Sequence, residues 1–370
     1  MCITSHPFER RTIMTMLVAA AIAGLSSNAS ATLRRDPVTL DRYSPSLGTA
    51  LSGGQNPYLL GKSDILHIVQ NPGQDGPLLH VAAGAFGVFN ANDNVRDITN
   101  NEEAVSFTSA PNLYYTVTRG SVGAAGSAIA GQAALNQHAA DRFVSTLNRS
   151  PQSVLQGAQT ASGSNVAVSV NQNFYGLTPN VGPDQAYVGA QDDADSLEIT
   201  EFVFSGETGR TKDIYFTLDR ASPSLSTLSV SPWKASDILF ASAANGGTTV
   251  TRFAASGQMG LSENDEIDGL ALLDGGTIGV LDAGDLALIS LTSTSSFIAG
   301  TAGRSGADVY VTSFSGGLSL YADYAALGLL VTDDVDGIDV DPTRIIAQVP
   351  EPTALAALVM LAGAAARRRR

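Results

Sequence analysis

The chain contains an internal repeat, and a repeat of fixed order constrains the architecture more than any single motif does. Its clearest copies are TLDRYSPSLGT at residues 39–49 and TLDRASPSLST at residues 217–227. Weaker relatives of this element are TVTRGS at residues 116–121 and SLTSTS at residues 290–295. The length of the clearest match excludes chance and predicts that the body of the protein is built from similar units.

Three further elements recur in the same order along the chain. An aspartate enters a β-rich run at Asp64, Asp141, Asp237 and Asp308. A glycine between apolar residues follows, at Gly87, Gly176, Gly260 and Gly328. The last element is acidic and then apolar: NDNVRDI, DDADSL, NDEIDGL and DDVDGI. We therefore expect a repeat domain at residues 32–346 with four units, at about 37–112, 113–212, 213–284 and 285–346.

The units have the composition of β-strands. Short runs such as IYFTLDR and DILFASA are rich in β-branched and aromatic residues and are separated by Gly-containing turns. Helical patterns are confined to residues 122–140 and 322–327. The fold class predicted is all-β.

The phase of the repeat suggests how the units close. The body opens on a TLDR strand with no acidic element before it and ends on an acidic element with no TLDR strand after it. If the first strand completes the last unit, the units form a small β-propeller. Tandem β-sandwiches or an open stack of repeats are the alternative.

The N-terminus has the layout of a secretory signal peptide. Two arginines precede an apolar stretch at residues 14–25, and the small residues Ala29, Ser30 and Ala31 follow. We expect residues 1–31 to be removed by cleavage after Ala31. The single cysteine, Cys2, lies inside this segment, so the mature chain is expected to contain no disulfide and no thiolate ligand.

The C-terminus, residues 347–370, combines a short motif, an apolar segment and a basic end. The motif is Val349, Pro350, Glu351 and Pro352; the apolar segment is residues 353–366; the end is Arg367, Arg368, Arg369 and Arg370. A helix of this apolar segment would reach about 21 Å, short for a membrane of about 30 Å. Arginines at its end are expected on the cytoplasmic side.

This order resembles the PEP-CTERM sorting signal of Gram-negative bacterial proteins. The resemblance implies that the tail holds the protein in the membrane through a short transmembrane helix. It also implies that the protease exosortase recognises residues 349–352 and removes the tail during export to the cell surface or extracellular matrix. The expected partners are therefore exosortase and the secretion machinery. The resemblance covers about the last 22 residues and implies nothing about the rest of the chain.

The charge of the chain excludes nucleic acid as a partner. The formal charge is -14, and residues 32–350 alone carry 15 Lys and Arg residues against 33 Asp and Glu residues. Nucleic-acid binding depends on a positive surface that neutralises phosphates. An acidic exported body instead suits contact with cations, extracellular polysaccharide or other surface proteins.

Sequence motifs of catalysis are missing. His67, His80 and His138 are the only histidines after residue 31, and no G-x-S-x-G or H-E-x-x-H motif accompanies them. We therefore expect a structural or binding protein rather than an enzyme, with no cofactor. The alternative is an extracytoplasmic hydrolase or lyase that uses aspartates. A cleft with two convergent aspartates and a nearby basic group would favour that alternative.

The acidic elements are the candidate ligand sites. Carboxylates gather there on short turns, as calcium sites require; the candidates are Asp265, Asp268, Asp333, Asp334 and Asp336. The competing interpretation is an acidic turn whose aspartates cap backbone amides. The first unit has Arg96 where the others have Asp195, Asp268 and Asp336, so an ion pair is expected to weaken or replace a metal there.

Overall fold

A computed structural model describes twelve segments of the chain. They are residues 37–47, 65–69, 76–81, 93–100, 112–123, 125–134, 138–146, 165–170, 192–199, 213–227, 232–242 and 250–340. The chain divides into two units, Met1–Ala31 and Thr32–Arg370, and every described residue belongs to the second. The predicted signal peptide, with its cleavage at Ala31, and the predicted sorting tail, with residues 349–352 and Arg367 to Arg370, lie outside the described residues.

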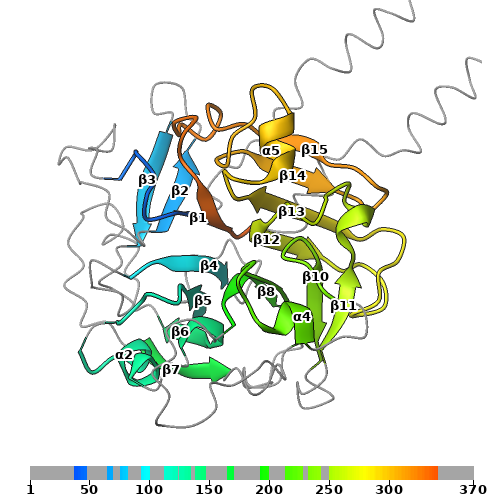
Figure 1. Cartoon of the computed structure of the whole chain (residues 1–370). Helices are drawn as coiled ribbons and strands as arrows, with labels where there is room; N and C mark the ends of the chain where they lie inside the picture. The colour runs from blue at the N-terminus through cyan, green and yellow to red at the C-terminus, as the bar shows by residue number, and fades with distance from the viewer. Residues whose placement is uncertain are drawn as a thin grey trace, which may run out of the picture. The chain divides into compact units, whose positions relative to one another are not determined.

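The described residues form an all-β fold of four antiparallel sheets with four strands each, as Figure 1 shows. Sheet A has the order β16 (Val335–Ile338), β1 (Pro37–Leu40), β2 (Ile65–Val69), β3 (Gly76–Val81). Sheet C has the order β4 (Val95–Asn100), β5 (Asn112–Val117), β6 (Arg142–Thr146), β7 (Asn165–Val170). Sheet D has the order β8 (Ala194–Ile199), β9 (Ile214–Leu218), β10 (Ile238–Ala241), β11 (Val250–Ala254). Sheet E has the order β12 (Ile267–Leu273), β13 (Leu286–Leu291), β14 (Val309–Thr312), β15 (Ser319–Ala322). The prediction of an all-β class is confirmed.

Sheet A joins the two ends of the repeat. Its strand β1 is the first described strand and pairs with β16, the last one, with Val38 opposite Ile338. The N-terminal TLDR strand thus lies beside the last acidic element, which lacks a TLDR strand after it in the sequence. In every sheet, the strand after an acidic element comes first and the TLDR-type strand comes second. The sheets therefore do not start at the predicted unit bounds.

The four strands that follow the acidic elements, β4, β8, β12 and β16, contact one another. We call them the inner strands. Each has a register irregularity against the next strand of its sheet, at the residues directly after the acidic turn. A bulge turns a side chain away from the regular alternation of a strand. The same irregularity in four sheets therefore gives all four inner strands a similar shape at one end.

The core is formed by apolar residues of the inner strands and of the strands beside them. The largest cluster lies between sheets D and E and contains Tyr215, Phe240, Phe253, Leu270 and Tyr310. The ring centroids of Tyr215 and Phe253 are 4.9 Å apart with the planes at 73°, an edge-to-face contact. These aromatic and branched residues fill the space between strands, as their strand propensity requires.

Helices are few and short among the described residues. They are α2 (Ala128–Ala133), α4 (Ser224–Thr227), α5 (Ser296–Gly300), and the 3-10 turns η2 (His138–Ala140) and η5 (Ser256–Gln258). The helical pattern at residues 122–140 corresponds to α2 and η2, and residues 324–328 form a turn. None of these helices is long and apolar enough to cross a membrane, and the predicted membrane segment 353–366 is outside the described residues.

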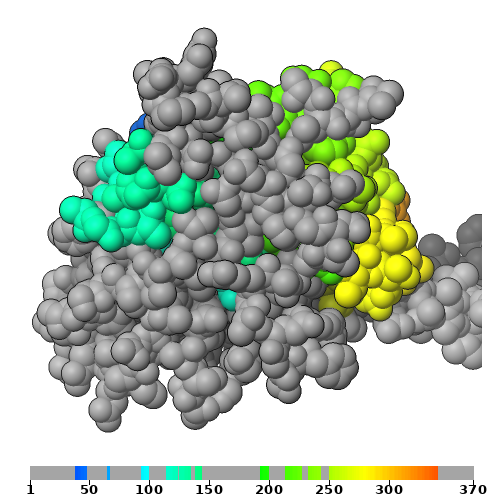
Figure 2. All heavy atoms as spheres, turned by 90° about the horizontal axis from the view of Figure 1, so that it is seen from below, coloured from blue at the N-terminus to red at the C-terminus, as the bar shows by residue number. Residues whose placement is uncertain are grey.

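The loop between β12 and β13 is the most exposed described connection of sheet E. It spans residues 274–285, includes Ile278 and Val280 at 47% and 55% exposure, and belongs to the yellow part of the chain at the surface in Figure 2. The inner strands, in contrast, are buried along almost their whole length.

Candidate binding site at the ends of the inner strands

The first aspartate of each acidic element caps a loop of its own sheet. Asp333 Oδ1 accepts from the Ser46 amide at 2.9 Å, and Asp333 Oδ2 accepts from the Ser46 hydroxyl at 2.5 Å. Asp192 makes the same pair of bonds with Ser224, at 2.9 and 2.6 Å. Asp93 accepts from the amides of Val122 and Gly123, and Asp265 from the Phe297 amide and the Ser296 hydroxyl. The second serine of SPSL is therefore the partner of an aspartate. That aspartate is 287 residues away for Ser46 and 32 residues away for Ser224.

In three of the elements, the acidic residue directly after the first aspartate reaches the preceding sheet. Asp193 of sheet D accepts from the Arg119 amide that follows β5, at 3.1 Å. Glu266 of sheet E accepts from the Arg220 amide, at 2.8 Å. Asp334 of sheet A accepts from the Ser293 amide, at 3.0 Å. These three carboxylates join sheet C to D, D to E, and E to A.

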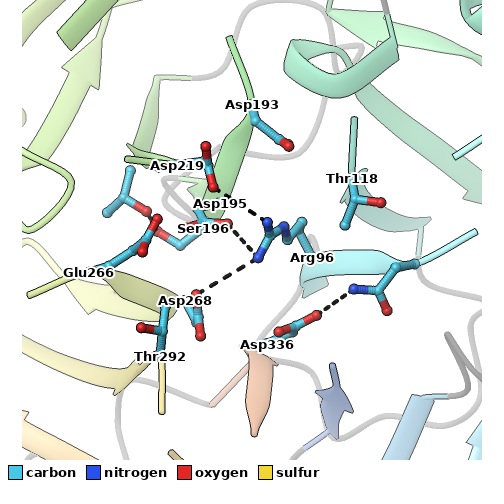
Figure 3. Close-up of polar contacts among 12 residues, drawn as sticks. Arg96, Thr118, Asp193, Asp195, Ser196, Asp219, Glu266, Asp268, Thr292 and Asp336 are labelled. Atoms are coloured by element: carbon cyan, nitrogen blue, oxygen red, sulfur yellow. Dashed lines mark hydrogen bonds and ion pairs between the residues drawn. The ribbon is translucent and has the colours of Figure 1, made fainter. Parts of the chain in front are cut away.

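The residue three positions after the first aspartate of each element lies on the inner strand and points toward a common centre. Figure 3 shows Asp195, Asp268 and Asp336 arranged around the guanidinium of Arg96. Arg96 Nη1 lies 3.0 Å from Asp195 Oδ1 and 3.9 Å from Asp268 Oδ1, and Arg96 Nη2 lies 3.6 Å from Asp219 Oδ2. The predicted ion pair at Arg96 is therefore present, and it joins sheet C to sheets D and E.

The residue after Arg96 binds all four sheets. Asp97 Oδ2 accepts from the amides of Leu197 and Leu270, at 2.6 and 3.3 Å. Its Oδ1 accepts from the amides of Ile98 and Ile338, at 2.7 and 3.2 Å. The four donors belong to β8, β12, β4 and β16. Burial raises the pKa of Asp97 well above its usual value, although these amides oppose the shift.

Small residues of the other inner strands make room for Asp97. The equivalent positions are Ser196, Gly269 and Gly337. A Cβ on Gly337 would lie 2.7 Å from Asp97 Oδ1 and 2.9 Å from its Cα. Glycine is needed at that position because two backbones approach closely there.

A cavity of about 260 Å³ opens beside Arg96, toward the contact of sheets E and A. Its wall contains the carboxylates of Asp41, Asp268, Asp334 and Asp336. The hydroxyl residues Thr292, Thr294 and Thr332 line it as well, together with Tyr43. Arg96 is the only cation among the residues that form this wall.

Arg96 alone does not supply enough positive charge to offset the burial of all the carboxylates around it. Burial raises the pKa of Asp195, Asp268 and Asp336 well above their usual value, and repulsion among them adds to the shift of Asp268. Burial likewise raises the pKa of Asp193 and Asp334 to about 6. For Arg96 burial alone would lower the pKa, but Asp195, Asp193 and the other acids raise it above its usual value.

Two classes of carboxylate thus come from one sequence element. Desolvation would raise the pKa of Asp265, but hydrogen bonds from Ser262, Phe297 and Ser296 lower it. Asp268, three residues later, accepts no hydrogen bond at Oδ1 among the described residues. Of the five candidates from the sequence, Asp265 and Asp333 cap loops, while Asp268, Asp334 and Asp336 line the cavity.

Three carboxylates have the spacing of a metal site. Ligand atoms of Asp195, Asp219 and Glu266 all lie within 4.8 Å of one another. Arg96 is 3.0 Å from the first and 3.6 Å from the second, and Arg220 is 3.7 Å from Glu266. The guanidinium groups supply at this point the positive charge that a metal ion would bring.

Several site residues were not singled out from the sequence. The repeat has a small residue, Ser196, Gly269 or Gly337, where the first copy has Asp97. That difference in the sequence could have identified Asp97. Asp41 and Asp219 are the aspartates of the two TLDR copies, which served only to mark the repeat. Among the described histidine side chains, His138 Nε2 lies 3.0 Å from the Arg119 carbonyl oxygen, a structural contact.

No family model, curated protein or solved structure matches the chain.

Proposed function

We propose that this chain is an exported binding protein of the cell surface or extracellular matrix of a Gram-negative bacterium. The observation that carries the binding role is the polar cavity beside Arg96. The next residue, Asp97, accepts hydrogen bonds from four sheets and so fixes the strand that carries Arg96. The layout of residues 1–31 and 349–370 supports the export role, with exosortase as processing partner and the membrane as a temporary anchor.

We further propose that the four sheets are the blades of a small β-propeller. The mutual contacts of β4, β8, β12 and β16 support this arrangement, as do the carboxylates that join successive sheets. The pairing of β1 with β16 supplies the closure. In a propeller, the ends of the inner strands surround the axis, which is a common place for ligands.

Intact mass and cell fractionation test the export role, using hosts with and without the sorting protease. The expected mature protein lacks residues 1–31 and the arginine tail in the host with the protease, and retains the tail in the other host. A full-length tail in both hosts would contradict the sorting proposal.

A second candidate function is a hydrolase or lyase. It is favoured by one observation: Asp268, Asp334 and Asp336 converge with Arg96 in one cavity, and their raised pKa values suit proton transfer. Release of reducing ends or unsaturated products from polysaccharides would establish it, provided that Asp336→Asn abolishes the release. Product formation that persists in Asp336→Asn would assign it to a contaminant.

A further inference from the structure

The wall of the cavity beside Arg96 contains a carboxylate with an oxygen that accepts no hydrogen bond from the described residues. Asp268 is 1% exposed and its Oδ1 accepts no hydrogen bond; the nearest cationic atom, Arg96 Nη1, is 3.9 Å away. Buried polar atoms of proteins are almost always hydrogen-bonded, so unused acceptors in a cavity indicate a donor that enters from outside.

The charge of the wall specifies a cationic donor. Four carboxylates line the cavity, and the one guanidinium among them also pairs with Asp195 and Asp219 on the far side. A ligand with a positive charge would relieve the repulsion that raises the pKa of Asp268. A neutral or anionic ligand would leave it in place.

The donor geometry of a primary ammonium suits the acceptors of this wall. A primary ammonium carries one charge and three hydrogen-bond donors. Those donors match acceptors on Asp268, Asp334 and Asp336, which are separate side chains of one wall.

The remainder of the cavity suits a small polyhydroxyl group. Its volume, about 260 Å³, is just below the range of small-molecule pockets and far above the space of one ion. Thr292, Thr294 and Thr332 contribute hydroxyls, and Tyr43 provides an aromatic ring that is 75% exposed. A single sugar ring with an amino group fits this combination of size, donors and charge.

We propose that this cavity binds the protonated amine of an amino sugar residue, with Asp268, Asp334 and Asp336 as acceptors. This inference rests on the proposed binding role and names the class of ligand. Asp268 contacts the ammonium, while Arg96 fixes the carboxylate and donates to sugar oxygens.

Calorimetry of the purified full-length chain near pH 6 tests the proposal. The probes are the glucosamine trisaccharide and its fully N-acetylated form, which has the same rings without the charge. We expect the free amine to bind at least tenfold more tightly than the acetylated form. Equal affinities, or no binding of the glucosamine trisaccharide, would overturn the proposal without any variant.

Two variants locate the site. Asp268→Asn removes one negative charge from the cavity, and Glu263→Gln removes one from a side chain that is 71% exposed and outside it. We expect a tenfold or greater loss of affinity in the first and none in the second. An equal loss in both would show a general charge effect and overturn the assignment.

Two further probes separate the competing cations. Tighter binding of calcium chloride than of the trisaccharide, lost in Asp268→Asn, would replace the amino sugar with a metal. Equally tight binding of spermidine would show that the sugar ring contributes nothing. These binding results do not depend on processing of the chain ends, so failure of the export experiment and failure of this proposal remain distinguishable.

Discussion

The inner strand β4 differs from its three counterparts at the two positions that face the centre. It carries Arg96 and Asp97, whereas β8 carries Asp195 and Ser196, and both β12 and β16 carry an aspartate followed by glycine. Three strands thus supply negative charge and space, while one supplies the cation and the acceptor that joins the sheets. The difference teaches that one divergent copy of a repeat can supply what its three similar copies lack.

The largest expected effect of breaking this asymmetry is at Asp97. Asp97→Ala removes the acceptor for four buried amides, one from each sheet, and leaves them without a partner. We expect the free energy of unfolding to fall by about 3–5 kcal/mol, measured by urea denaturation. Ser196→Ala, at the equivalent position of β8, is the control and should cost about 1 kcal/mol. Equal losses in the two variants would contradict the proposal that the four amide donors of Asp97 contribute most to stability.

Arg96 is expected to come second. Arg96→Gln keeps a hydrogen-bonding side chain but leaves Asp195 and Asp268 without a counter-charge. We expect a loss of about 3 kcal/mol near pH 8. The loss should be smaller near pH 5, because the acids are then protonated in the variant and need no counter-charge. A loss that does not change with pH would contradict the role of Arg96 as their counter-ion.

The pH dependence of the unaltered chain is the next largest effect. The pKa values of Asp193 and Asp334 are raised to about 6 and that of Glu198 to about 8, because burial disfavours the charged forms. A carboxyl group with a raised pKa binds its proton more tightly in the folded state. The stability it contributes is full below about pH 4 and is lost as pH rises through the folded-state pKa.

We therefore expect the free energy of unfolding to fall steadily between about pH 5 and about pH 8. Urea denaturation across this range measures it. Asp265 has the opposite sign, since its lowered pKa makes its contribution disappear only in stronger acid. Stability that rises between these two pH values would contradict the burial of the acidic centre.

The sequence predicted the strands better than the site because the repeat is local and the site is not. TLDRYSPSLGT and its copy at residues 217–227 identify β1 and β9 directly, and the unmatched ends predict the pairing of β1 with β16. The four donors to Asp97, in contrast, come from residues 98, 197, 270 and 338. A one-dimensional pattern does not specify that these amides meet at one carboxylate.

The acidic elements show the same limit in another form. Asp265 and Asp268 are three residues apart and were treated as one candidate calcium group, yet the first caps a loop and the second faces the cavity. The register irregularity of β12 between Ile267 and Gly269 separates their directions. Because that irregularity depends on pairing with β13, composition alone does not assign the two carboxylates to different roles.

The smallest predicted effect concerns the positions where the copies are most alike. Ser46 and Ser224 each donate an amide and a hydroxyl to the first aspartate of an acidic element, Asp333 and Asp192. Ser46→Ala and Ser224→Ala each remove the hydroxyl bond and keep the amide bond, so each should cost about 1 kcal/mol in urea denaturation. The two losses should agree within about 0.5 kcal/mol, since the donor and acceptor groups are the same in both sheets and all four residues are buried. A clearly larger loss in Ser46→Ala would show that β1, which comes from the opposite end of the chain, depends more on this bond than β9 does.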